Sequence, residues 1–202
     1  MYKIILACLT LTGFTHAAAI ISKLETVEPS LYVSGTVTGG GDITIWAGKL
    51  VFDKFDAFCS DPFKDIAVGD TVSYVTSNWQ SVPHGETTAR IIAMYLGSNK
   101  TPMDAAAAQW AIWKELENDG SDFGTGAVRI TSNQSELVAM ASQYLQGNGA
   151  FQPASVLFLE SATKQDMVAF NFSISAVPEP TPTALLLCFL VTGFSLTRNR
   201  KH

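Results

Sequence analysis

Cys59 and Gln109 are the residues of this chain whose types and surroundings point most directly to covalent chemistry. Gln109 lies in the stretch AAAAQWAIWKEL, where an apolar face at helical spacing is formed by Gln109, Ile112, Trp113 and Leu116. A buried primary amide loses its hydrogen bonds to water, so it must find partners inside the protein or be chemically altered. Gln109 is therefore expected to have a partner inside the protein.

Cys59 is the only cysteine outside the two apolar ends of the chain, since Cys8 and Cys188 lie within those ends. A single thiol in an exported domain is buried and inert, joined to another chain, catalytic, or protected by some other bond. Attack of the Cys59 thiol on the carboxamide carbon of Gln109, with loss of ammonia, would leave an internal thioester. Two ordinary explanations stay open, in which Cys59 is a small buried hydrophobe and Gln109 caps a backbone group.

A thioester makes two demands on the fold. The sulfur and the carboxamide must be held at near-attack distance, which is worth up to roughly 7–11 kcal/mol in well-oriented systems. Donors must also face the developing oxyanion, each worth about 3 kcal/mol in acyl-transfer enzymes. We expect Phe58, Ile112 and Trp113 to form an apolar wall that keeps hydrolytic water away from the bond.

The two ends of the chain carry export signals. Residues 1–19 combine a basic start, an apolar run and a small-residue cleavage pattern at Ala17 to Ala19, which together predict a secretory signal peptide. Residues 177–202 contain a proline-rich break, an apolar segment at 184–196 and a basic end. That segment is shorter than the roughly 20 residues of a usual membrane-spanning helix, which favours a temporary anchor over a permanent one.

The C-terminal segment closely resembles the PEP-CTERM sorting signal, through Val177, Pro178, Glu179 and Pro180 followed by the apolar run and the basic end. The resemblance implies a Gram-negative bacterium and recognition by an exosortase, a membrane enzyme that processes this signal. It also implies transient anchoring in the inner membrane, with delivery to the cell surface or the extracellular matrix.

Between these ends, residues 20–176 are expected to form one domain. Strands are predicted at 31–38 and 43–52, joined by a glycine turn, and at 55–59, 71–77, 155–160 and 167–174. Helices are predicted at 86–96, at 102–117 with Thr101 as its cap, and at 132–147 with Ser132 or Asn133 as its cap. This order predicts an α+β fold, a β-sandwich or barrel carrying an inserted helical bundle.

Phe58 and Cys59, followed fifty residues later by Gln109, Ile112 and Trp113, resemble the motifs of the thioester domains of bacterial surface adhesins. Those domains carry an aromatic-Cys motif and a Thr-Gln-x-Ala-Ile-Trp motif on a β-sandwich with helices. The resemblance implies that Cys59 supplies the thiol, that Gln109 supplies the acyl group, and that Ile112 and Trp113 pack around the bond. This chain has Ala108 where the adhesin motif has threonine.

Charge and composition exclude several other functions. Residues 20–176 hold nine Lys and Arg against seventeen Asp and Glu, so no basic surface is available for nucleic acid. Cys and His are too few for a closed zinc site. The acidic cluster Asp53, Asp56, Asp61, Asp65 and Asp70 lacks the spacing of the familiar calcium loop, and it is interpreted as a solvated face. We expect neither a metal nor a cofactor.

The sequence thus predicts an exported, adhesin-like surface protein that is not a turnover enzyme. Its thioester would capture an amine or hydroxyl group on an unknown surface protein or polysaccharide. One alternative is a structural matrix or biofilm protein with no thioester. The other is a thiol hydrolase in which Cys59 pairs with His84, the single histidine of the central domain.

Overall fold

The computed structural model describes residues 19–36, 42–131 and 134–172. The predicted signal peptide up to residue 18, the sorting signal at 177–202 and the apolar segment at 184–196 lie outside the described residues. Residues 39–41 of the predicted glycine turn and the proposed caps Ser132 and Asn133 also lie outside them. Within the described ranges, no helix has the length and apolar character needed to cross a membrane.

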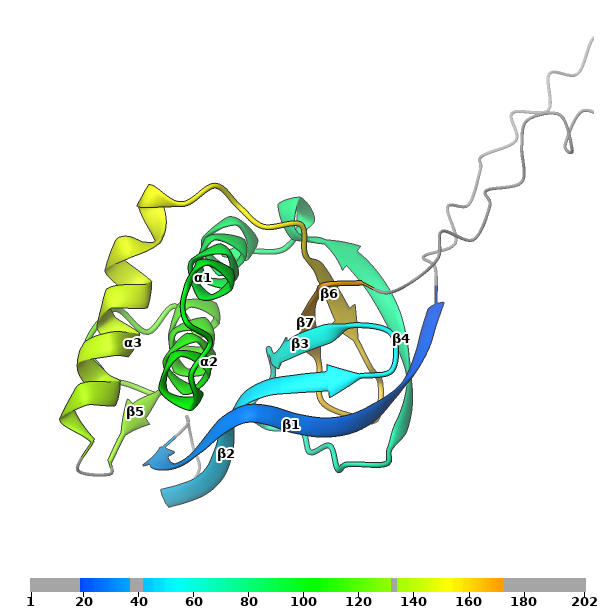
Figure 1. Cartoon of the computed structure of the whole chain (residues 1–202), viewed down its shortest axis with the longest axis horizontal. Helices are drawn as coiled ribbons and strands as arrows, with labels where there is room; N and C mark the ends of the chain where they lie inside the picture. Colours follow the sequence, from blue (N-terminus) through cyan, green and yellow to red (C-terminus); the bar gives the residue numbers. More distant parts are fainter. Residues whose placement is uncertain (1–18, 37–41, 132–133, 173–202) are drawn as a thin grey trace, which may run out of the picture. The chain divides into compact units, whose positions relative to one another are not determined.

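The described strands all pair in an antiparallel manner, and three helices accompany them (Figure 1). The predicted α+β class is therefore confirmed at this level. The strands are β1 (Ala19–Thr36), β2 (Asp42–Phe52), β3 (Asp56–Cys59), β4 (Thr71–Asn78), β5 (Arg129–Ile130), β6 (Leu157–Glu160) and β7 (Met167–Phe170). The helices are α1 (Gly85–Gly97), α2 (Pro102–Leu116) and α3 (Ser135–Gly147), with short 3₁₀ turns at Trp79–Ser81 and Asn148–Ala150.

The strand pairing closes on itself. The order is β2-β3-β7-β6-β4-β1-β5, and β1 also pairs with β2. β1 can have both neighbours because residues 19–23 pair with β4, whereas residues 24–36 pair with β2. The helices enter this ring as insertions, with α1 and α2 between β4 and β5 and α3 between β5 and β6.

β1 begins at Ala19, twelve residues before the beginning of the strand predicted at 31–38, so that predicted beginning was wrong. The additional residues include Pro29, which usually argues against a strand interior. Register shifts between Leu24 and Thr26 and between Val27 and Ser30 accommodate this proline while the pairing with β2 continues on both sides. Bulges of this kind leave no simple alternation in the sequence.

The start of α2 follows the prediction closely. Thr101 is the N-cap, and its hydroxyl accepts a hydrogen bond from the backbone N–H of Asp104 at 3.1 Å. The Asp104 carboxylate in turn accepts one from the Thr101 backbone N–H at 2.9 Å. Together with Pro102 in the first turn, this capping box determines where the helix begins.

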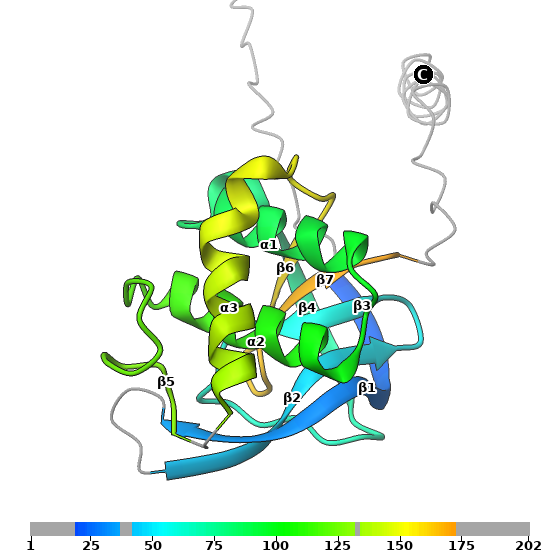
Figure 2. The same ribbon diagram turned by 60° about the vertical axis from the view of Figure 1, so that its left-hand side comes forward.

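α2 is the central helix of the domain. It lies between α3 and the strands in Figure 1, and Figure 2 shows it above β1 and β2 with α1 beside it. Gln109, Ile112 and Trp113 of the predicted face are buried, but the burial extends further, because every residue from Ala105 to Lys114 is buried. The four alanines at 105–108 allow this, because small side chains let other elements approach the helix from more than one side.

Candidate functional site

Cys59 and Gln109 are joined by two hydrogen bonds. The backbone N–H of Cys59 donates to Oε1 of Gln109 at 2.9 Å, and Nε2 of Gln109 donates to the backbone carbonyl of Cys59 at 2.8 Å. Both residues are buried, with 3% and 2% of their surfaces exposed. The structure therefore brings the two sequence-predicted residues together across fifty positions, and the carboxamide is held against the cysteine backbone.

Secondary structure positions both partners. Cys59 is the last residue of β3, where it is paired with Met167 of β7, and the next backbone N–H, that of Ser60, donates to the carbonyl of Asp166 at 2.9 Å. Gln109 lies in the middle of α2, where a helical backbone fixes the direction of its side chain. The pair is thus held between a strand end and a rigid helix.

The sulfur of Cys59 has two polar contacts of its own. The indole Nε1–H of Trp113 donates to Sγ at 3.4 Å, and the thiol donates to the backbone carbonyl of Asp61 at 3.1 Å. Burial raises the pKa of the Cys59 thiol far above its usual range, and the Trp113 hydrogen bond opposes that effect only in part. The thiol is therefore protonated at neutral pH, unlike the thiolate of a cysteine hydrolase.

The three predicted packing residues have different positions. Trp113 contacts the sulfur and lines the cavity beside it. Phe58 is buried against other aromatic rings, stacked on Phe170 at 5.5 Å between centroids and edge-on to Tyr95 at 5.0 Å. Ile112 is fully buried in the core. Phe58 and Ile112 are not among the residues that line the cavity, so Trp113 is the one that borders both the sulfur and this space.

A cavity of about 330 Å³ adjoins the pair. Most of its wall is aliphatic or aromatic, and Cys59, Gln109 and Trp113 form part of it. The remaining lining residues are Val27, Ile43, Ile45, Trp46, Gly48, Leu50, Pro62, Lys64, Asp65, Ile66, Val68 and Gln165. The buried pair is therefore next to a space that a small group from another molecule can occupy.

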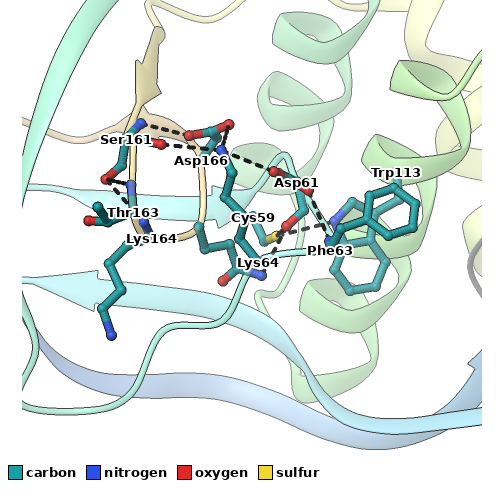
Figure 3. Close-up of polar contacts among 10 residues, drawn as sticks. Cys59, Asp61, Phe63, Lys64, Trp113, Ser161, Thr163, Lys164 and Asp166 are labelled. Carbon is teal, nitrogen blue, oxygen red and sulfur yellow. Dashed lines mark hydrogen bonds and ion pairs between the residues drawn. The ribbon is translucent and has the colours of Figure 1, made fainter. Parts of the chain in front are cut away.

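An ion-pair network supports the chain that follows Cys59 (Figure 3). Nζ of Lys64 lies 2.9 Å from a carboxylate oxygen of Asp166 and 3.3 Å from one of Asp61, and it donates to the carbonyl of Ser161 at 3.2 Å. The hydrogen bond to Asp166 is the main reason that the pKa of Lys64 is raised. Sequence reasoning missed Lys64, because its acidic partner Asp166 is about a hundred residues away in the chain.

The acidic residues around Cys59 do not converge on a common centre. Asp53 accepts from Ser22, Asp56 from Lys49, and Asp70 from Lys164. Among the described residues, no group of three or more His, Cys, Asp or Glu side chains is arranged to hold a metal ion. The aspartates mostly have separate basic or hydroxyl partners, which the prediction of a solvated face did not include.

His84 lies elsewhere. It is the N-cap residue of α1, and its Nδ1 is 3.0 Å from a carboxylate oxygen of Glu115 near the end of α2. His84 lines a different cavity from the one beside Cys59. In the described part of the chain, no hydrogen bond joins His84 to Cys59, so the structure does not bring these two residues together.

Lys114 is a buried cation that the sequence did not reveal. Its side chain is fully buried on α2, where Nζ lies 2.6 Å from the carboxylate of Asp119. The same ammonium donates to the carbonyls of Thr125 and Val128 at 2.7 and 2.8 Å, and it lies 5.7 Å from the ring centroid of Phe123. Lys114 therefore organises the loop that leads from α2 to β5.

The arrangement around Cys59 is suited to acyl transfer between a thiol and a carboxamide, because a donor already faces the carboxamide oxygen and another faces the sulfur. No family model, curated protein or solved structure matches this chain.

Proposed function

We propose that the protein is an exported surface protein whose Cys59 and Gln109 form an internal thioester that captures a nucleophile on a partner. The observation that carries this proposal is the reciprocal pair of hydrogen bonds between the Gln109 carboxamide and the Cys59 backbone. These bonds place the acyl group beside the cysteine and orient both of its polar atoms.

Thioester formation would use the existing contacts. The Cys59 sulfur attacks Cδ of Gln109, the carbon–nitrogen bond breaks, and the thiol proton leaves with the amide nitrogen as ammonia. The Cys59 backbone N–H already donates to Oε1, so it is the donor for the negative charge that develops on this oxygen. The Trp113 indole N–H would stabilise negative charge on the sulfur.

The burial of the sulfur carries no charge penalty for the bonded product. A thiolate is costly in this environment, as the raised pKa of Cys59 indicates, whereas a thioester sulfur, like the neutral thiol, carries no charge. When an amine later attacks the acyl carbon, the sulfur leaves with a proton from the amine as a neutral thiol. Gln109 then becomes joined to the partner through a substituted amide.

The wider assignment follows the sequence resemblances. The finer architecture proposed for residues 20–176 is a β-sandwich or barrel with inserted helices, similar to adhesin thioester domains. The closed ring of strand pairs and the insertions of α1, α2 and α3 support it. Export, exosortase processing and a cell-surface or matrix location are proposed from the two ends of the chain. Each molecule would react once, so the protein would not be a turnover enzyme.

Methylamine tests this function. If the thioester exists, methylamine converts Gln109 to N-methylglutamine and releases one free thiol, both of which peptide mapping detects. Cys59→Ala and Gln109→Ala each prevent both changes. Asn148→Ala, the amide-to-alanine control matched to Gln109→Ala, lies outside the site and leaves them intact. The proposal fails if wild-type protein exposed to methylamine retains an unmodified Gln109 and gains no thiol.

A second candidate is a structural surface protein without the thioester. The same two hydrogen bonds favour it, because a satisfied buried carboxamide can simply clamp α2 to β3. In that case Cys59 is a protonated buried thiol before and after methylamine treatment, and Cys59→Ala changes neither the mass of Gln109 nor its reactivity.

A further inference from the structure

β2 continues beyond the point at which its neighbour β3 ends. The ladder between them pairs Leu50 with Ala57 and Val51 with Asp56. Continuing this register by two residues sets Gly48 opposite Cys59, the last residue of β3. In the described part of the chain, residues 42–47 of β2 have a strand partner in β1 but none on the side of β3. This part of β2 is therefore an unpaired edge.

The cavity beside the site borders this part of β2. The cavity beside the site is bordered by Ile43, Ile45 and Gly48 of β2 at one wall, and Cys59 and Gln109 form another part of its lining. An unpaired strand edge offers a row of main-chain donors and acceptors to any extended chain laid beside it. Here that row borders the cavity next to the reactive pair.

The cavity adjoins a larger surface groove of about 850 Å³, and the two share Val27, Trp46 and Val68. Large apolar side chains are exposed on this side of the molecule. Trp46 is 65% exposed and Val68 is 61% exposed, and Trp46 packs against the half-exposed Tyr32 with ring centroids 5.1 Å apart. Clustered exposed apolar side chains of this size are typical of interaction surfaces.

The chemistry of the surface favours a polypeptide over a polysaccharide. Several polar side chains of the lining already have bonds within the domain: Lys64 to Asp166, Gln165 to the Asp61 carbonyl, and Ser30 to the Val27 carbonyl. Apart from the charged side chains of Glu28, Asp65 and Lys100, the surface offers mainly apolar walls and a main-chain edge. An extended polypeptide uses both, because its backbone pairs with the edge and its alternate side chains enter the pockets.

We propose that residues 42–47 of β2 accept an extended polypeptide segment of the partner, in the position that continues β3. Its apolar side chains face Ile43 and Ile45, and an amine-bearing side chain at its inner end reaches Gln109. The covalent step rests on the proposed thioester, whereas the docking itself does not.

The Cys59→Ser protein cannot form a thioester, so it allows peptide binding to be measured separately from the covalent step. The probe is a fluorescein-labelled peptide, Thr-Val-Thr-Val-Thr-Lys, and binding is followed by anisotropy. Two further peptides carry N-methyl groups at alternate residues, one at the odd positions and one at the even positions. Only one edge of an added strand bonds to β2, and only alternate residues direct their N–H groups to that edge. One N-methylated peptide should therefore lose about ten-fold or more in affinity, and the other should bind like the parent.

Variants locate the docking surface. Trp46→Ala and Val68→Asp should each weaken binding of the parent peptide about five-fold or more. Ile21→Ala and Val75→Asp are matched changes at exposed apolar residues that line neither cavity, and they should leave binding unchanged. The proposal is overturned if no peptide binds, if both N-methylated peptides bind like the parent, or if alginate oligosaccharides compete fully with the peptide. Concentration-dependent self-association that Trp46→Ala abolishes would instead identify a second copy as the occupant.

Wild-type protein separates this proposal from the proposed function. Methylamine adduct formation without peptide binding would retain the thioester and reject the docking strand. Peptide binding without any methylamine adduct would retain the docking strand and reject the thioester. If both hold, the peptide lysine should form its adduct faster than methylamine at equal concentration, and Val68→Asp should abolish that advantage.

Discussion

The indole N–H of Trp113 donates a hydrogen bond to the sulfur of Cys59 at 3.4 Å, one helical turn beyond Gln109 on α2. The same helix thus presents the carboxamide and a donor to the sulfur. The Cys59 N–H is bonded to the carboxamide oxygen at the same time. Both atoms on which charge would develop during acyl transfer therefore have a donor in place.

Trp113→Phe removes the donor to the sulfur and retains most of the ring. We expect methylamine to open the thioester of this variant roughly five- to ten-fold more slowly, because one hydrogen bond to the leaving sulfur is lost. Trp110→Phe is the matched control, since Nε1 of the buried Trp110 has no hydrogen-bond partner among the described residues. Equal rates for the two variants, measured by mass spectrometry over time, would rule out this role for Trp113.

Lys114→Met removes one donor from the carboxylate of Asp119, which keeps the Val128 N–H, and also removes a donor from two backbone carbonyls. We expect a loss of about 3–5 kcal/mol in the free energy of unfolding, as for other buried ion pairs that lose one partner. Lys49→Met breaks a partly exposed pair with Asp56 and should cost about 1 kcal/mol or less. Urea denaturation measures both, and similar losses would contradict the structural role of Lys114.

Acid should weaken the loop that Lys114 organises. Burial tends to raise the pKa of Asp119, but the hydrogen bonds from Lys114 and from the backbone N–H of Val128 outweigh it, so the pKa lies below its usual value. The contribution of Asp119 to stability is therefore complete above its unfolded-state pKa of about 4, and it is lost as the pH falls through the lower folded value.

Asp119→Asn lacks this titration, so the difference in stability between the wild type and this variant should be largest at neutral pH and should shrink below about pH 4. Asp42→Asn, at the exposed start of β2, serves as the control. Thermal unfolding between pH 7 and pH 2.5 gives the comparison. A difference that stays constant over this range would show that the Asp119 carboxylate is not stabilised by Lys114.

Gly35→Ala should disturb the packing of α2 on β1. A methyl group at this position would overlap the ring of Trp110 and the backbone carbonyl of Arg129. We expect a loss of about 1–3 kcal/mol in the free energy of unfolding, as for other overpacked sites. Gly149→Ala, with no neighbouring atom within 4 Å of the added methyl, should be close to neutral. A stable Gly35→Ala protein would contradict the close approach of Trp110 to β1.

Local signals in the sequence predicted the beginning of α2 and the burial of Gln109. The burial extends beyond the predicted face, because α2 is enclosed on more than one side and its alanines permit this. The two-residue strand β5 and the N-terminal part of β1 were missed. Their pairings join distant segments, and Pro29 obscures the alternation of β1.

The candidate site was predictable as two residues but not as a geometry. Chemistry and spacing single out Cys59 and Gln109, and the structure adds the direction of their hydrogen bonds. The roles of Lys64 and of the buried Lys114 depend on contacts with distant or looped segments. General rules place lysines on the surface, so a sequence alone gives no reason to expect a buried one.

The intact mass of the purified protein, measured under denaturing conditions with its termini determined by peptide mapping, tests the thioester most directly. With the thioester formed, the measured mass should be lower than the sequence mass by one ammonia, and Cys59→Ser and Gln109→Ala should each have the mass expected from their sequence. A wild-type mass equal to that of the sequence, with the Cys59 thiol titrating after denaturation, would contradict the thioester.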